Sequence, residues 1–93
     1  MQAQKNGHTI LVGEDELEVR AYLEMALKSL GYAVELAQDG EEILHYLKNG
    51  QSKFSAVLLD LMMPQGDGIE TLREIRRMDS NLPVIIVSGA ASP

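Results

Sequence analysis

Four short apolar runs rich in β-branched residues recur along the chain, at residues 9–12, 33–36, 56–59 and 84–87. Apart from Glu35 in the second run, the apolar residues are continuous instead of alternating, which is typical of strands buried on both faces of a parallel sheet. In the segments between them, apolar residues recur every three or four positions, as they do on one face of a helix. The pattern therefore predicts the order βαβαβαβ, an α/β fold whose parallel strands are joined by right-handed helical crossovers.

Each helical segment opens with an acidic residue that is followed three positions later by glutamate. These openings lie at Asp15, Asp39 and Asp67. The spacing resembles a capping box, in which two side chains satisfy free N–H groups at a helix start. In the first segment the predicted apolar stripe consists of Leu23, Ala26, Leu27 and Leu30, and Gly31 marks its end.

Composition narrows the possible functions. The 93 residues include 8 Lys and Arg against 14 Asp and Glu, a net charge of −6, and no cysteine. This length predicts one domain, and the missing cysteines exclude disulfides and thiolate chemistry. An acidic chain is a poor ligand for nucleic acid or an anionic membrane, and its apolar runs are too short to span one. We expect a cytoplasmic domain over residues 8–93, with residues 1–7 as a flexible N-terminal tail.

Polar residues follow three of the predicted strands at their carboxyl ends, where ligands bind in open parallel sheets. They are Glu14, Asp15 and Glu16 after the first strand, Asp60 after the third and Ser88 after the fourth. Asp15 alone is compatible with a simple helix cap, and Ser88 with a turn. Asp60, however, follows four apolar residues and needs a partner to offset its desolvation. Clustered carboxylates repel one another, and a hard cation such as Mg²⁺ relieves that cost.

Three stretches of the chain resemble the receiver domain of bacterial two-component response regulators. Their sequences are ILVGEDE (10–16), VLLDLMMPQGDG (57–68) and LPVIIVSGA (82–90), of which the second is highly specific. The resemblance covers the chain from Thr9 onward. It implies a flavodoxin-like parallel sheet of strand order 2-1-3-4 with helices on both faces. It also implies that the usual final helix, strand and helix are missing.

The resemblance assigns a role to each residue that matches the family pattern. Asp60 corresponds to the aspartate that a sensor histidine kinase phosphorylates, and Ser88 to the hydroxyl that moves toward the phosphoryl group. The implied Mg²⁺ ligands are Asp15, Asp60, the Met62 carbonyl and, through a bound water, Glu14. Backbone N–H groups of the phosphate loops are assigned to Met63 and Gly89. Pro64 and Gly68 fit the loop after the acceptor strand, and Asp67 is interpreted as a helix cap.

The implied activity is formation of an aspartyl phosphate from a phosphohistidine donor, followed by slow autodephosphorylation. No other enzyme activity is expected. Both reacting groups are anionic, so the step needs positioning and charge neutralisation above all. The added phosphoryl charge would bias a bistable surface that an effector domain or partner protein reads.

Three departures from the family pattern are visible. Glu14 stands at a position where Asp is commoner in the family, which predicts an altered metal affinity. Gly13 removes a side chain from the end of the first strand, and the sequence gives no reason for it. The family's phosphate-pairing lysine and aromatic switch residue have no counterpart, since no lysine lies at a matching place. We therefore expect the chain to be deficient in retaining the phosphoryl group or in switching. Without the usual fifth strand, the fourth strand is expected to be an uncovered apolar edge, which favours a homodimer or a swapped assembly through residues 84–87. A fragment of a longer regulator is the alternative to that assembly.

Other functions agree less well with the sequence. A phosphorylation-independent scaffold with the receiver fold stays open as the main alternative. A phosphatase of the haloacid-dehalogenase type needs a second acid two residues after its nucleophile, where this chain has Met62. Nucleotide binding is disfavoured because neither a Walker A loop nor a G-x-G-x-x-G motif is present. His8 and His45 are isolated, and His45 is predicted on a partly exposed helix face.

Overall fold

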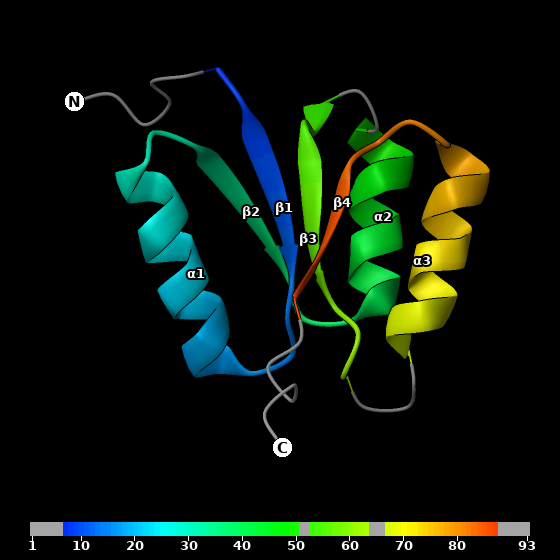
Figure 1. Cartoon of the computed structure of the whole chain (residues 1–93), viewed down its shortest axis with the longest axis horizontal. Coiled ribbons are helices and arrows are strands. Elements are labelled where there is room, and N and C mark those ends of the chain that lie inside the picture. The colour runs from blue at the N-terminus through cyan, green and yellow to red at the C-terminus, as the bar shows by residue number, and fades with distance from the viewer. Residues whose placement is uncertain (1–6, 51–52, 64–66, 88–93) are drawn as a thin grey trace.

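The computed structural model describes residues 7–50, 53–63 and 67–87. Its strands are β1 (Thr9–Gly13), β2 (Ala33–Ala37), β3 (Ala56–Asp60) and β4 (Val84–Val87). Its helices are α1 (Leu17–Ser29), α2 (Gly40–Gly50) and α3 (Asp67–Met78). The strands form one parallel sheet of order β2-β1-β3-β4 (Figure 1). The predicted element order and strand order are therefore confirmed, and three strands extend one residue beyond their predicted ends.

The register of the sheet brings the carboxyl ends of the strands to one edge. Gly13 at the end of β1 pairs with Ala37 of β2 and Leu59 of β3, and Asp60 pairs with Val87 of β4. In a parallel sheet the loops that follow the strands all leave from this edge. Any site formed after β1 and β3 is therefore shared between two loops that lie side by side.

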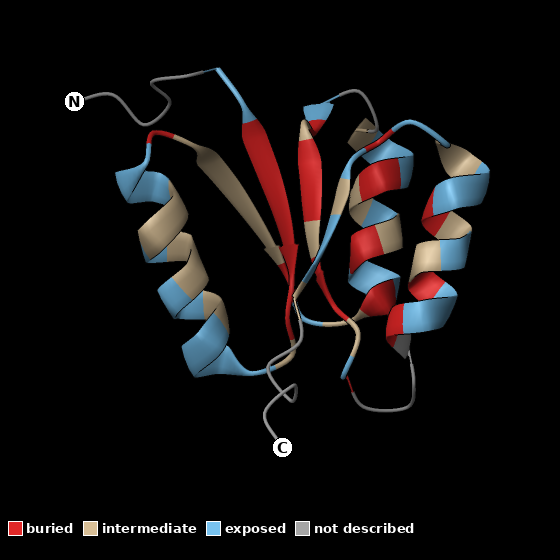
Figure 2. Ribbon diagram, viewed as in Figure 1, coloured by how far each residue is buried: buried red, intermediate tan, exposed pale blue. Residues whose placement is uncertain are grey.

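The two faces of the sheet are covered unequally. Helices α2 and α3 lie on one face and α1 on the other (Figure 1). The α2/α3 face contains the larger buried cluster, whereas the α1 face buries only Ile10, Val12 and Ala56. Figure 2 shows buried residues on β1, β3 and α2, while α1 carries intermediate and exposed residues only. The larger cluster comprises Leu11, Ala37, Ile43, Leu47, Phe54, Val57, Leu59, Met63, Ile75 and Leu82.

The helix starts agree only in part with the predicted capping boxes. At α2 the Glu42 N–H donates to Asp39 Oδ1 at 2.9 Å, and Glu42 Oε1 accepts from the Gln38 N–H at 2.9 Å. The prediction for α1 is wrong, because its N-cap is Glu16, which makes no side-chain capping bond. The Asp15 side chain instead joins a cluster of carboxylates. Helix α3 begins at Asp67 as predicted, but the cap assigned to the Asp67 side chain lies outside the described part.

The apolar stripe predicted for α1 is also only partly correct. Leu23 and Leu27 pack against the smaller cluster, but Leu30 is 68% exposed. Helix α1 ends before Leu30, and Gly31 takes a left-handed φ of 98° while its N–H donates to the Lys28 carbonyl. Gly31 therefore terminates the helix as predicted, and Leu30 is turned out of the stripe.

Strand β4 is the least covered strand of the sheet. It pairs with β3 on one side, and its central residues Ile85 and Ile86 are 52% and 43% exposed. These two apolar side chains are therefore exposed within the described part of the chain, while the predicted uncovered edge stays a prediction. In the same part of the chain, every helix is too short or too polar to cross a membrane.

Candidate phosphoacceptor and metal site

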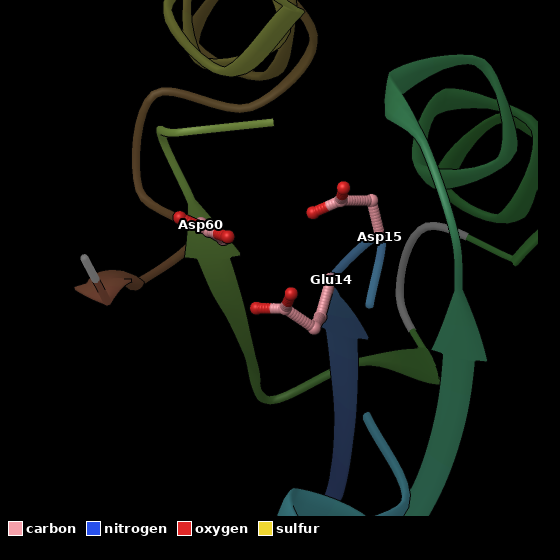
Figure 3. A group of neighbouring side chains, drawn as sticks. All are labelled: Glu14, Asp15 and Asp60. Atoms are coloured by element: carbon pink, nitrogen blue, oxygen red, sulfur yellow. The ribbon is translucent and has the colours of Figure 1, made fainter. Parts of the chain in front are cut away.

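Three carboxylates converge at the carboxyl edge of the sheet. Glu14 and Asp15 follow β1, and Asp60 is the last residue of β3. One carboxylate oxygen from each residue lies within 4.8 Å of the other two. Figure 3 shows the three side chains directed into a common space. Glu14 and Asp60 are buried, at 4% and 7% exposure, and Asp15 is half-buried. The sequence-based expectation that these three residues meet is confirmed.

Backbone N–H groups orient two of the three carboxylates. The Glu16 N–H donates to Glu14 Oε2 at 3.0 Å, and the Met62 N–H donates to Asp60 Oδ1 at 2.9 Å. In both cases the donor lies two residues after the acid, so each acid closes a small local turn. The two turns fix the directions in which the buried carboxylates face each other.

The electrostatics of the cluster are unfavourable for three negative charges. The pKa of Glu14 is raised from 4.5 to about 7, mainly because the carboxyl group is buried. Hydrogen bonding to Asp60 and repulsion from Asp60 and Asp15 contribute to this rise, and the hydrogen bond from the Glu16 N–H opposes it. A group that titrates near neutral pH carries a proton part of the time, and a bound cation would favour its charged form.

The cluster lines a hollow of about 340 Å³ at the sheet edge. The donors are carboxylate oxygens held close together, which is the ligand set that hard divalent cations such as Mg²⁺ prefer. The residues present therefore fit such an ion. The other residues that line the hollow are Glu16, Val19, Met62 and Val87.

The remaining predicted site residues are placed only in part. Met62 lines the hollow and is 58% exposed, whereas Met63 is buried in the core under α2 and α3. Ser88, Gly89 and Pro64 lie outside the described residues. Val87, which directly precedes Ser88, lines the hollow, so the chain leaves β4 beside the carboxylates.

Two glycines next to the site allow close packing that sequence analysis did not explain. A Cβ atom on Gly13 would collide with the Ile43 side chain of α2, so α2 packs directly over the end of β1. A Cβ atom on Gly68 would overlap the Leu61 backbone just after Asp60. A glycine at the end of a buried strand is a recognised sign of such close approach.

Arg20 on α1 is a third feature that sequence analysis missed. Its Nη1 donates to the carbonyl oxygens of Glu14 at 2.8 Å and Asp15 at 3.2 Å. The sequence did contain a sign of this role. Arg20 lies three residues before Leu23 and seven before Leu27, and this spacing places its positive charge on the face of α1 that packs against the sheet.

Comparison with known proteins identifies the family. The profile of the response regulator receiver domain matches residues 10–93. The chain belongs to this family. A curated relative is the response regulator MprA of Mycobacterium sp. (strain KMS), which is 42% identical over 83 residues. That alignment covers 89% of this chain and 35% of the relative, so the chain spans about a third of the relative's length. The expected family and fold are thus confirmed.

Solved receiver structures agree with the same fold. The response regulator TrrA of Thermotoga maritima, solved in complex with Mg²⁺-BeF, is 32% identical with a TM-score of 0.83. That match covers 90% of this receiver domain and 71% of TrrA. A chain of the CheX–CheY–BeF3–Mg²⁺ complex from Borrelia burgdorferi is 33% identical with a TM-score of 0.82, and the match covers 87% of this chain and 61% of that one. TrrA was also solved in complex with the histidine kinase ThkA.

Proposed function

We propose that this receiver domain accepts a phosphoryl group from a sensor histidine kinase onto Asp60, with Mg²⁺ bound in the carboxylate cluster. The observation that carries the proposal is the convergence of Glu14, Asp15 and Asp60, whose oxygens lie within 4.8 Å of one another. Solved relatives that contain Mg²⁺ and beryllofluoride, or a histidine kinase, support the same assignment.

The chemistry follows from the position of Asp60. One Asp60 oxygen forms the new bond to phosphorus while the bond between phosphorus and the histidine nitrogen of the donor breaks. The Met62 N–H holds Oδ1 of this carboxylate in a fixed direction, which lowers the cost of orienting the nucleophile. Asp15, Asp60 and the Met62 carbonyl would hold Mg²⁺, with Glu14 acting through a bound water. The ion would supply positive charge against the two reacting anions.

The switch is assigned to residues at the ends of β3 and β4. The backbone N–H groups of Met63 and Gly89 are proposed to take up phosphoryl oxygens, and the Ser88 hydroxyl to move toward them. The position of Val87 in the wall of the hollow supports this, because it brings the residue that precedes Ser88 to the site. The charge of the phosphoryl group would then change how the segment after β4 packs.

The remaining proposals concern the domain boundaries, the cellular location and the partners of the domain. We assign residues 8–93 to the receiver domain, in line with the match at residues 10–93, and residues 1–7 to an N-terminal tail. The domain is proposed to be cytoplasmic and to act on an effector domain or partner protein, without contacting nucleic acid or membrane itself. Its own chemistry is limited to accepting the phosphoryl group and losing it slowly to water.

The experiment is phosphorylation of the chain by acetyl phosphate, followed by Phos-tag electrophoresis. We expect a slower band that requires Mg²⁺ and is lost in Asp60→Asn. Asp79→Asn is the matched control, because Asp79 lies after α3 and outside the hollow. A band that survives Asp60→Asn would contradict the acceptor assignment. No band in the wild-type chain would favour the phosphorylation-independent scaffold.

Exposure of β4 supports a second proposal, a homodimer formed through this strand. Ile85 and Ile86 are 52% and 43% exposed, and among the described residues β4 pairs with β3 alone. A strand edge of this kind presents backbone groups to which another chain can pair. Sizing chromatography at high micromolar concentration should give a dimer that Ile85→Lys dissociates. Leu30→Lys, at an apolar position 68% exposed on the end of α1, is the control that should leave the dimer intact. A wild-type monomer would overturn this proposal.

A further inference from the structure

Arg20 connects α1 to the loop that carries the acidic pair. Its Nη1 donates one hydrogen bond to the Glu14 carbonyl at 2.8 Å and another to the Asp15 carbonyl at 3.2 Å. A single terminal nitrogen of the guanidinium thus binds two consecutive carbonyl groups. The peptide planes on both sides of Asp15 are thereby tied to one point on the helix.

This connection matters because packing alone holds α1 weakly. None of the residues of α1 is buried, and its first residue, Leu17, is 70% exposed. The N-cap residue Glu16 makes no side-chain capping bond that would fix the loop from the helix side. The hydrogen bonds from Arg20 therefore help to fix the loop between β1 and α1, which neither buried side chains of α1 nor a side-chain cap holds in place.

Arg20 engages the backbone oxygens of the acidic pair and leaves its carboxylates available to the cluster. Its Nη1 binds the carbonyl oxygens of Glu14 and Asp15, while Figure 3 shows the two carboxylates directed toward Asp60. Mg²⁺ requires near-ideal octahedral geometry with short bonds, whereas Ca²⁺ accepts more ligands, longer bonds and irregular geometry. A loop whose peptide planes are fixed therefore favours Mg²⁺, whereas a loop whose peptide planes can move favours Ca²⁺.

We propose that Arg20 is a positioning residue that sets the preference of the carboxylate cluster for Mg²⁺ over Ca²⁺. This inference rests on the proposed function, because it concerns the same metal site. Arg20 acts through the backbone of Glu14 and Asp15 and does not itself bind the ion. Partners of metal ligands in other proteins commonly change metal affinity by roughly 10–100-fold when they are removed.

The test is calorimetric titration of the chain with MgCl₂ and, separately, with CaCl₂. Arg20→Met keeps much of the aliphatic stem but removes the charge and the donors, and Arg20→Lys keeps the charge without the guanidinium. We expect Arg20→Met to weaken Mg²⁺ binding by roughly tenfold or more and Ca²⁺ binding by less than about threefold. Arg20→Lys should recover less than half of the lost preference. Arg73→Met, in an exposed ion pair with Glu70 on α3, should leave both affinities unchanged.

A second measurement uses the metal-free chain. Loss of the two hydrogen bonds should shift the carbonyl ¹³C resonances of Glu14 and Asp15 in Arg20→Met and leave those of α3 in place. Unshifted resonances would overturn the inference whatever the titrations give.

The outcomes separate this inference from the proposed function. Equal losses of Mg²⁺ and Ca²⁺ affinity in Arg20→Met, or a preference fully restored by Arg20→Lys, would overturn the positioning role while the metal site stands. A wild-type chain that binds no Mg²⁺ would overturn both. If Arg20→Met does not fold, the test rests on Arg20→Lys. A ratio of Mg²⁺ to Ca²⁺ affinity in Arg20→Lys equal to that of the wild type would contradict the role of the guanidinium.

Discussion

The two faces of the sheet differ in how they contribute to the molecule. The α2/α3 face contains most of the fully buried side chains, among them Leu11, Ile43, Leu47, Leu59 and Ile75. The α1 face buries three residues, and α1 itself buries none. Yet the loop between β1 and α1 provides two of the three clustered carboxylates. The acidic pair thus precedes the less firmly packed helix, and Asp60 belongs to a strand packed against the firmer layer.

This difference has a consequence for energetics. Assembling three carboxylates costs free energy, which the large core of the α2/α3 face must offset. On the α1 side, where packing is weaker, hydrogen bonds from the Glu16 N–H and from Arg20 order the loop that carries the acidic pair. Changes in the core should therefore act on stability, whereas changes around α1 should act on the geometry of the site.

The largest effect is expected from truncating a leucine on the firmly packed face. Leu47→Ala removes a side chain that is 1% exposed, and such a change costs about 2–5 kcal/mol in the free energy of unfolding. Leu27→Ala on α1 removes a partly buried side chain of the smaller cluster and should cost about 1 kcal/mol. Urea denaturation of both variants measures the difference. Equal losses would mean that the two faces contribute equally and that the comparison is wrong.

A pH-dependent effect of somewhat smaller size is expected from Glu14. Its pKa in the folded chain, about 7, lies above its ordinary value of 4.5. Between these values the folded chain holds a proton that the unfolded chain has lost. The contribution of Glu14 to stability is therefore full below pH 4.5 and is lost as the pH rises through 7. At about 1.4 kcal/mol per pKa unit, the loss in the metal-free chain is about 3 kcal/mol.

Urea denaturation of the metal-free chain at about pH 5 and about pH 8 tests this dependence. Glu14→Gln should lack this part of the pH response, since its amide does not titrate. Saturating Mg²⁺ should restore stability at the higher pH in the wild-type chain, because the ion favours the charged carboxylate. The same pH response in Glu14→Gln and in the wild type would assign the effect to other groups.

Most of the fold was predictable from the sequence, for a physical reason that the strands make clear. The run at residues 56–59 is apolar throughout, which is typical of a strand covered on both faces of a parallel sheet. The start of α1 was not predictable, because Asp15 has the spacing of a cap but its carboxylate is drawn into the cluster. A local spacing rule does not include the long-range partner Asp60.

The carboxylates of the site were predictable from the sequence, but the contacts of Arg20 and Gly13 that position them were not. Glu14, Asp15 and Asp60 follow strand ends, and strand order alone brings them together. The contacts of Arg20 depend on how α1 rotates against the sheet, which a helical pattern fixes only coarsely. A glycine is needed at position 13 because the Ile43 side chain lies against it. Ile43 is thirty residues away in the sequence and reaches Gly13 only when α2 packs on the sheet.

The smallest of the three effects is expected at Gly13, where the firmly packed face meets the site. A methyl group at this position would collide with the Ile43 side chain, and its nearest approach is to Cδ1. Overpacking of this kind costs about 1–3 kcal/mol, so Gly13→Ala should lower the free energy of unfolding by that amount. Because Gly13 directly precedes Glu14, the shift of the backbone should also weaken Mg²⁺ binding, although no ligand has been changed.

The second substitution Ile43→Val makes this prediction a double-mutant cycle, because it removes the δ-carbon that the new methyl group meets. In the wild-type background Ile43→Val should cost about 0.5–1.5 kcal/mol. In the Gly13→Ala background it should cost less or be stabilising, and part of the Mg²⁺ affinity should return. Strictly additive effects on stability and binding would show that α2 and the β1 end are not coupled through this contact. In that case the core under α2 would support the fold without influencing the geometry of the acidic pair.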